Sequence, residues 1–227
     1  MRVLAIDTAL AACSAAVFDT QQGGIIARES LPMLRGHAEA LMPLIRRIMN
    51  EAATAFRDLD RVVVTTGPGS FAGLRVGIAA ARGIALAITK PAVGLSTLSA
   101  YAAPYLANDD NAPVVVAVDA RHSHVYLQVF AAGGRTVTGP RLAPLNEAVR
   151  AAAAVPARIV GSAAQLVADG LAVTDATPIH VDANGAPDID WVARMGAALP
   201  EGQSPPKPQY LRAPDAQPQN AAQLPRR

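Results

Sequence analysis

The chain has 227 residues, of which 51% are hydrophobic and 4% aromatic, and its 20 basic and 18 acidic side chains nearly balance. This composition excludes a disordered chain and predicts one large or two small packed domains. No run of 18 apolar residues occurs, so no membrane span is expected, and the single cysteine, Cys13, excludes an intrachain disulfide or a thiolate metal cage. Few lysines and few aromatics disfavour an independent nucleic-acid binder. The start of the chain lacks the pattern of a secretion signal, so we expect a cytoplasmic protein.

The first 106 residues predict the order β-β-β-α-β-α-β-α. Short apolar runs bounded by turn residues indicate the strands, and apolar residues at helical spacing indicate the helices. Lys90 and Pro91 end the second helix. The expected strands are 3–7, 13–18, 25–30, 61–66 and 92–94, and the expected helices are 37–53, 70–89 and 97–106.

The second half of the sequence repeats the beginning of the first at a constant offset. The run 3–7 resembles 115–119, and the same offset places Val17 and Phe18 on Val129 and Phe130. Two matches at one offset without a gap favour a duplicated fold. The strands expected here are 115–119, one that ends at 130, 135–138 and 158–161, and the expected helices are 144–154, 162–170 and 188–199.

Three regions follow from this layout. Residues 1–106 form a first lobe, and residues 107–199 form a smaller second lobe of the same pattern. Residues 200–227 hold seven prolines and five glutamines, a composition that sustains neither a helix nor a buried strand. We expect this tail to dock near 209–212, where Tyr210 and Leu211 lie, and to be mobile after Pro214.

The glycine-rich segment 67–73 lies between an expected strand and an expected helix. Free backbone N–H groups and the helix dipole favour an anion at such a place. The segment loosely fits a dinucleotide fingerprint, but no acidic residue occurs from Arg75 through Tyr105, and no Lys-Ser or Lys-Thr pair follows the glycines. A tight turn without a ligand therefore remains the favoured interpretation, and a phosphate site the alternative.

The helix after this loop has a face of very small side chains. Gly73, Gly77, Ala80, Ala81 and Ala87 let another helix approach closely. The face serves either internal packing or an intersubunit bundle formed with the helix 37–53. Composition does not choose between the two.

Other polar residues give weaker signals. Asp7 and Asp119 end equivalent strands, where a two-lobed nucleotide-binding fold places carboxylates that face a cleft, but capping of turns is favoured for both. His122 and His124 lie two apart without a third ligand nearby, so a metal site is disfavoured. Ser70 lacks a nucleophile motif, so a serine hydrolase is also disfavoured.

Taken together, several motifs resemble the bacterial TsaB (YeaZ) family. The resemblance extends to about residue 212, and the lobe 130–200 matches only in layout. The segments that carry it are 1–9, 13–17, His37 before 41–44, 67–77, 94–98, Asp119-Ala120-Arg121 and Tyr210-Leu211-Arg212.

The resemblance implies an α/β, actin-like (ribonuclease H-like) fold, a duplicated βββαβαβα arrangement in two lobes. It also implies a non-catalytic subunit that dimerises with TsaD and supports transfer of threonylcarbamoyl to adenosine 37 of tRNAs. The ATPase TsaE takes part, and TsaC or its longer relative makes the carbamoyl-adenylate donor. The chain would form a homodimer when alone, reach tRNA only through the complex and contact no membrane.

One departure from the catalytic paralogue supports a non-catalytic role. Where TsaD carries two metal-binding histidines four residues apart, this sequence has Thr97 and Tyr101. Neither is a convincing metal ligand at neutral pH. We therefore expect no metal and no cofactor of its own, with ATP or ADP and the metal used by the partner subunits.

Two sets of residues are candidates for binding, the first from the sequence motifs above and the second from the resemblance. A nucleotide or anion would contact Asp7, Thr8, Gly67, Gly69, Ser70 and Gly73. The dimer interface would use His37, Leu41, Leu44, Ile45, Ile48, Leu74, Gly77, Ile78 and Ala81. Two alternatives remain: an independent actin-like enzyme, either a small-molecule kinase or peptidase-like, and a structural homodimer without a role in tRNA modification.

Overall fold

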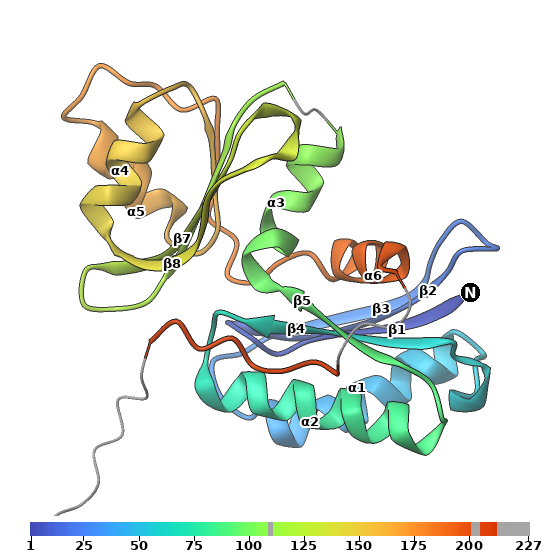
Figure 1. Cartoon of the computed structure of the whole chain (residues 1–227). Helices are drawn as coiled ribbons and strands as arrows, with labels where there is room; N and C mark the ends of the chain where they lie inside the picture. The colour runs from blue at the N-terminus through green and yellow to red at the C-terminus, as the bar shows by residue number, and fades with distance from the viewer. Residues whose placement is uncertain (109–110, 201–204, 213–227) are drawn as a thin grey trace, which may run out of the picture.

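The computed structural model describes residues 1–108, 111–200 and 205–212, which form two five-stranded sheets with helices packed on them (Figure 1). The first half contains β1 (Arg2–Asp7), β2 (Ala12–Asp19), β3 (Gly24–Pro32), α1 (His37–Glu51), β4 (Arg61–Gly67), α2 (Phe71–Ala87), β5 (Ala92–Ser96) and α3 (Thr97–Asn108). The second contains β6 (Val114–Asp119), β7 (His124–Phe130), β8 (Thr136–Pro144), α4 (Leu145–Ala153), β9 (Arg158–Val160), α5 (Ala164–Leu171), β10 (His180–Asp182) and α6 (Ile189–Ala198). Two short 3-10 turns complete the list: η1 (Phe56–Asp58) lies between α1 and β4, and η2 (Ala132–Gly134) lies between β7 and β8.

The two halves share one topology. The first sheet has the order β3-β2-β1-β4-β5, and the second has the corresponding order β8-β7-β6-β9-β10. In each sheet three strands are antiparallel and the last two add in parallel. The strands β1, β2 and β3 begin at residues 2, 12 and 24, and β6, β7 and β8 begin at 114, 124 and 136, so one offset relates all three pairs. The predicted duplicated, actin-like fold is confirmed.

The first sheet is covered on both faces, which explains why β1 is an almost continuous apolar run. Leu4 and Ile6 face α1 and α2, whereas Val3 and Ala5 face α6. Figure 1 shows α1 and α2 side by side on one face of this sheet and α6 on the other. The apolar stripe of α1 therefore finds its partner surface within the same chain.

The last helix of each half packs against the sheet of the other half. Helix α3 places Leu98 and Tyr101 against the second sheet, and α6 places Ile189 and Val192 against the first. The boundary expected near residue 106 thus separates the strands of the two sheets. Each sheet, however, is partly covered by a helix from the other half of the chain. We call the first sheet with α1, α2 and α6 the first lobe, and the second sheet with α3, α4 and α5 the second lobe.

A buried arginine fastens α6 to the first lobe. The Arg61 guanidinium donates hydrogen bonds to the carbonyl oxygens of Gly196 and Leu199, both at 2.7 Å, at the end of α6 where carbonyls lack helical partners. Gly196 lies so close to β4 that a Cβ there would lie 2.3 Å from Val63 Cγ2. These contacts hold α6, which comes from the second half of the chain, on the first sheet.

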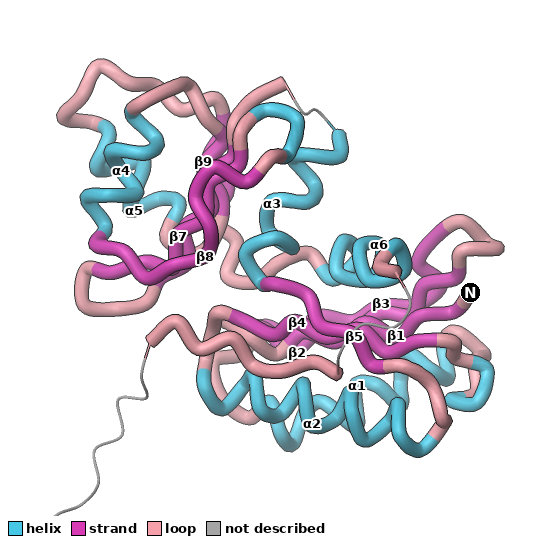
Figure 2. The backbone as a smooth tube through the Cα atoms, in the orientation of Figure 1, coloured by secondary structure: helices cyan, strands magenta, loops and turns pink. Residues whose placement is uncertain are grey.

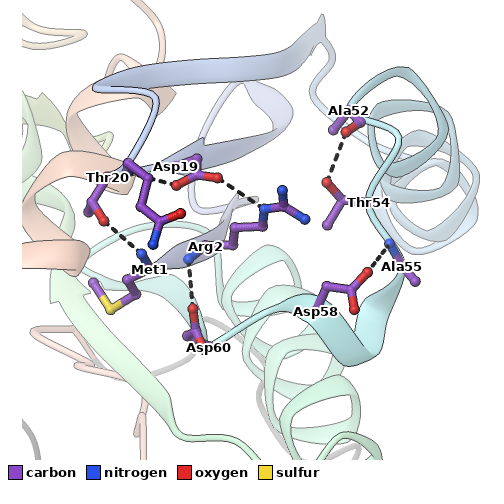
Figure 3. Close-up of polar contacts among 10 residues, drawn as sticks. Met1, Arg2, Asp19, Thr20, Ala52, Thr54, Ala55, Asp58 and Asp60 are labelled. Atoms are coloured by element: carbon purple, nitrogen blue, oxygen red, sulfur yellow. Dashed lines mark hydrogen bonds and ion pairs between the residues drawn. The ribbon is translucent and has the colours of Figure 1, made fainter.

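Polar contacts fix the end of the first sheet that lies away from the second lobe (Figure 3). The Met1 amino group donates to Thr20 Oγ1 at 2.7 Å, and the Arg2 N–H donates to Asp60 Oδ2 at 2.9 Å. The Arg2 side chain donates to Asp19 Oδ2 at 3.0 Å and lowers the pKa of that carboxyl. With the start of β1 fixed there, its carboxyl end at Asp7 points toward the other lobe.

Residues 205–212, which we call the C-terminal strap, run from the first lobe to the second (Figure 1, red). The Gln209 N–H donates to the Thr66 carbonyl at 2.7 Å, and the Tyr210 ring lies 4.9 Å from the Phe71 ring. Arg212 donates to the Ala120 carbonyl at 2.7 Å. The mobile part expected after Pro214 lies outside the described residues.

The second half differs from its predicted elements in two places. The third strand, β8, continues to Pro144 instead of ending at 138, and a further strand, β10, covers His180–Asp182. Strand β10 has only three residues and no apolar alternation, so the sequence held no signal for it. Figure 2 shows how loops make up much of the outer part of this lobe. Across residues 1–108, 111–200 and 205–212, no helix is long and apolar enough to cross a membrane.

Candidate functional site

The turn between β1 and β2 meets the beginning of α2. The Ser70 N–H donates to the Ala9 carbonyl at 2.7 Å, and the Thr8 hydroxyl donates to the Gly73 carbonyl at 2.7 Å. Ser70 also caps α2, because its side chain accepts a hydrogen bond from the Gly73 N–H. The two loops therefore satisfy each other's polar groups.

The glycines of the loop 67–73 permit this contact. A Cβ at Gly69 would lie 2.4 Å from the Ala9 carbonyl oxygen, and one at Gly73 would lie 2.1 Å from the Thr8 carbonyl oxygen. Gly67 has a φ of 111°, which only glycine adopts readily. Of the six residues predicted for an anion, Thr8 and Gly73 are buried and hydrogen-bonded to each other, and Gly69 packs on the Ala9 backbone. Ser70 is exposed and, with Gly69, lines the cleft described below.

Asp7 lies beneath this contact and is fully buried. Its Oδ1 accepts hydrogen bonds from the Thr65 hydroxyl and from the Ala9 N–H, the latter at 3.2 Å. Its Oδ2 has no hydrogen-bond partner among the described residues. Burial raises the pKa of Asp7 to about 6, although both hydrogen bonds and His37 oppose that rise. Asp7 acts here as an internal turn residue.

A cleft of about 560 Å³ lies between the two lobes. Ser70 and Phe71 at the start of α2 form part of one wall, and the turn that follows β6 forms another. The C-terminal strap adds Tyr210 and Arg212. Among the residues that the structure describes, the cleft is lined by three arginines from separate segments, Arg35, Arg121 and Arg212, and by one acidic residue, Asp119.

The turn after β6 has an unusual backbone. Arg121, His122 and Ser123 all have left-handed φ angles, of 63°, 52° and 57°. Consecutive non-glycine residues rarely adopt this conformation, which costs free energy and is found most often at functional sites. The turn is held because Asp119 Oδ1 accepts the Arg121 N–H at 2.7 Å and the Arg121 carbonyl accepts the His124 N–H at 3.1 Å.

The two histidines of this turn do not converge on a common point. His124 Nδ1 lies 2.7 Å from the His122 carbonyl oxygen, and His122 Nδ1 lies 3.3 Å from the Arg212 guanidinium. Within the described part of the chain, no group of three His, Cys, Asp or Glu side chains could hold a metal ion.

Thr97 and Tyr101, which the resemblance sets against two metal-binding histidines, lie inside the protein, on α3. Thr97 is fully buried at the first position of the helix, and Tyr101 is nearly so. The Tyr101 hydroxyl donates to the Asn184 carbonyl at 2.9 Å, and burial raises its pKa, so it stays a neutral phenol at physiological pH. A neutral phenol and a threonine hydroxyl offer poor ligands to a divalent metal.

The residues predicted for a dimer interface need correction. All nine are buried within the first lobe, where they pack on the first sheet or on the turn after β1: His37, Leu41, Leu44, Ile45, Ile48, Leu74, Gly77, Ile78 and Ala81. The His37 ring is within 3.1 Å of the Leu10 carbonyl oxygen, and a Cβ at Gly77 would lie 2.4 Å from Thr8 Oγ1. An amphipathic stripe fits any apolar surface, and here that surface is the chain's own sheet.

Sequence reasoning missed the arginines of the cleft as a group. Arg35 follows β3, Arg121 follows β6, and Arg212 belongs to the strap, so no spacing in the sequence connects them. Arg121 and Arg212 lie inside segments that carry the family resemblance, but only the fold reveals that they share a cleft.

Comparisons with known proteins agree with this picture. The family model of TsaD, tRNA N6-adenosine threonylcarbamoyltransferase, matches residues 11–196. The chain is 37% identical to the tRNA threonylcarbamoyladenosine biosynthesis protein TsaB of Escherichia coli K12, over 56% of this chain and 53% of that protein. The match thus spans about half the length of that curated relative.

Two further relatives match over nearly their whole length. An uncharacterized protein of Mycobacterium tuberculosis is 34% identical over 95% of this chain and 94% of that protein. The structure of YeaZ from Pseudomonas aeruginosa superposes with a TM-score of 0.77 at 26% identity, and the match covers 92% of this chain and 99% of that one. Together, these matches show that this chain belongs to the TsaB/YeaZ family of the TsaD-like proteins.

Proposed function

We propose that this chain is a non-catalytic subunit that pairs with TsaD and supports the transfer of threonylcarbamoyl to adenosine 37 of tRNAs. TsaE acts with the pair, and ATP, ADP and the metal are used by the partner subunits. The chain works in the cytoplasm, forms a homodimer when alone and contacts tRNA only through the complex. Family membership supports the pathway, and the chain's own residues support the division of labour.

The observation that carries the proposal is the pair Thr97 and Tyr101. They lie four apart, one turn of α3, where the catalytic paralogue presents two metal-binding histidines. Both are buried, and Tyr101 is already hydrogen-bonded to Asn184. A chain with these side chains has no equivalent means of holding a catalytic metal at this position, so the chemistry belongs to TsaD.

The outward side of α1 and α2 supports the pairing. This surface, which we call the outer helix face, consists of exposed residues on the two helices: Met42, Arg46, Ala72, Arg75, Ala79, Arg82, Gly83 and Leu86. Leu86 is 81% exposed and Met42 is 48% exposed. Short side chains near Leu86 allow a second pair of helices to approach closely, and a large exposed apolar side chain is typical of an interface anchor.

The outer helix face would serve both the homodimer and the pair with TsaD. A second copy of the chain would present the same residues in a self-complementary contact, and TsaD, which shares the fold, would present related helices. Because both partners need the outer helix face, TsaD should displace the homodimer. Mixing the chain with TsaD should convert the homodimer peak in size-exclusion chromatography into a heterodimer peak.

The experiment that tests the proposal reconstitutes the modification. Cognate TsaC-type, TsaD and TsaE proteins are incubated with tRNA, ATP, threonine and bicarbonate, with and without this chain. We expect threonylcarbamoyladenosine to form only when the chain is present, and none to form when the chain replaces TsaD. Equal modification without the chain would contradict the proposal, and modification by the chain without TsaD would favour an independent enzyme.

A further inference from the structure

We propose that the C-terminal strap is a one-sided latch between the two lobes. Residues 206–210 stay docked on the first lobe, and Arg212 reversibly holds the second lobe. Release of Arg212 lets the lobes move apart at the places where the chain crosses between them. This property goes beyond the pairing with TsaD and does not depend on it.

The chain crosses between the lobes at two places before it reaches the strap. The first crossing is the junction of β5 and α3, at Ser96 and Thr97, and the second is the segment 183–188 between β10 and α6. The second crossing contains Gly185 and Pro187 and is neither helix nor strand. Relative motion of two lobes is absorbed by a few loop or element-terminal residues of this kind. The strap adds a third connection, which relies on non-covalent contacts.

The first part of the strap is docked closely on the ends of β4 and β5 (Figure 1). Pro206 is buried beside Gly94, where an added Cβ would lie 3.2 Å from Pro206 Cβ. The Gln209 N–H donates to the Thr66 carbonyl at 2.7 Å. The Gln209 carbonyl oxygen lies so close to Gly67 that an added Cβ there would be 2.8 Å away. Both backbone and side-chain contacts therefore hold this part of the strap on the first lobe.

Tyr210 strengthens this docking through two residues of α2. Its ring lies 4.9 Å from the Phe71 ring, and its hydroxyl accepts a hydrogen bond from Arg75 Nε at 3.2 Å. The Arg75 guanidinium also lies 3.8 Å from the centre of the Phe71 ring. Aromatic and cation–π contacts thus join the three side chains and keep Tyr210 in place although it is 41% exposed.

Arg212 connects the strap to the second lobe. Its guanidinium donates to the Ala120 carbonyl at 2.7 Å and lies 3.3 Å from His122 Nδ1. Both acceptors belong to the turn after β6. A side-chain hydrogen bond at a partly exposed site exchanges with water at little net cost, so this end can detach while residues 206–210 remain docked.

The position of the strap gives the latch a consequence for the cleft. Gln209, Tyr210 and Arg212 all line the cleft of about 560 Å³ between the lobes. The strap therefore forms part of its wall and bridges its two sides. A latch that favours the closed arrangement of the lobes sets how wide this cleft is, and its release shifts the population toward a wider one.

The test measures the separation of the lobes in the full-length chain by double electron–electron resonance. Spin labels are attached to Arg57→Cys in the first lobe, at an 88% exposed side chain, and to Val173→Cys in the second, at a 90% exposed residue. The native Cys13 is fully buried, and mass spectrometry checks that it stays unlabelled. Arg212→Ala should add a population at longer distance and raise the ratio of open to closed molecules about fivefold, as expected for loss of one such hydrogen bond.

Lys207→Ala is the matched control. Lys207 is exposed on the same strap and has no hydrogen bond or ion pair among the described residues, so its variant should keep the wild-type distance distribution. An unchanged distribution in Arg212→Ala would overturn the proposal, because the lobes would then be held by other contacts. An equal change in Lys207→Ala would overturn it as well.

Hydrogen exchange of the Gln209 N–H tests whether the latch opens at one end. Arg212→Ala should leave this exchange rate unchanged, because the N–H remains bonded to Thr66. Tyr210→Ala loosens the docked part and should raise the rate about tenfold. Equally fast exchange in both variants would overturn the one-sided latch and show that the strap detaches as a unit. Circular dichroism spectra that match the wild type would confirm that both variants keep the fold.

Discussion

The two halves of this molecule place equivalent turns on either side of one cleft and use them in opposite ways. The turn after β1 carries Asp7, which is fully buried and sealed against α2. The turn after β6 carries Asp119 at the equivalent position, but that residue is exposed and followed by three left-handed residues. The two halves share one backbone layout, but their turns differ in side chains. The turn after β1 forms a buried contact with α2, and the turn after β6 exposes charged side chains at the edge of the cleft.

The difference shows how two copies of one backbone layout can make different contacts. In the first half, the glycines that permit close approach in a ligand-binding loop admit the chain's own Thr8 and Ala9 instead. In the second half, the loop before α5 contacts the end of β6, where the Ser162 hydroxyl accepts the Asp119 N–H at 3.0 Å, and the Asp119 side chain stays exposed beside the cleft. Four substitutions or pairs of substitutions would break or sharpen this contrast.

The largest change in the free energy of unfolding is expected from a substitution at Gly73. A Cβ there would lie 2.1 Å from the Thr8 carbonyl oxygen, a backbone atom that cannot move away easily. Gly73→Ala should lower the free energy of unfolding by about 3 kcal/mol. Gly83→Ala, on the same helix with nothing within 4 Å, should instead raise it by about 0.5 to 1 kcal/mol. Urea denaturation of both variants tests whether the sealed contact is essential, and equal effects would argue against it.

The second effect concerns the pH dependence of stability. The pKa of Asp7 is about 6 in the folded protein, compared with 3.8 for the free side chain. The favourable contribution of Asp7 to the free energy of unfolding is therefore fully present below pH 3.8, and it is lost as the pH rises through about 6. Asp7→Asn removes this loss, so between acidic and neutral pH the free energy of unfolding of the variant should rise relative to that of the wild type by on the order of 3 kcal/mol. Melting temperatures measured across this range test the prediction, and parallel curves would contradict it.

The third prediction compares the exposed surfaces of the two lobes. Leu86→Glu places a charge on the outer helix face and should weaken binding to TsaD at least about tenfold. Val173→Glu changes a 90% exposed residue of the second lobe and should leave the affinity unchanged. Biolayer interferometry with immobilised TsaD provides the measurement. Wild-type affinity for Leu86→Glu would remove α2 from the proposed interface.

The smallest effect is expected at the C-terminal strap. Arg212→Ala removes the hydrogen bond to the Ala120 carbonyl and the contact with His122. A single partly buried hydrogen bond of this kind contributes about 1 kcal/mol, so the melting temperature should fall by a few degrees. Differential scanning calorimetry would detect this, and an unchanged transition would show that the strap does not link the lobes energetically.

The duplicated fold could be predicted from the sequence because β1 and β6 are buried on both faces. Burial on both sides makes each strand a continuous apolar run, and two such runs with matching neighbours reveal the repeat. Strand β10 could not be found in this way, since its three residues are half-buried or exposed. The exchange of α3 and α6 between the sheets left no signal either, because an apolar helix face does not specify which sheet it covers.

The candidate site was predicted less well for related reasons. The small-residue face of α2 and the stripe of α1 were correctly identified as packing surfaces, but their partner proved to be the chain itself. The glycine loop was located correctly, and its contact with the turn after β1 depends on backbone distances that composition does not contain. The arginines of the cleft come from three separate segments and converge only in the folded chain.

The central claim is that this chain supports tRNA modification without chemistry of its own. The most direct measurement is the rate of threonylcarbamoyladenosine formation in the reconstituted system when the wild-type chain is replaced by the double variant Asp7→Asn, Asp119→Asn. The account predicts an unchanged rate, because these carboxylates support turns and take no part in the reaction. A variant that still binds TsaD but no longer stimulates modification would contradict the account and assign chemistry to this chain.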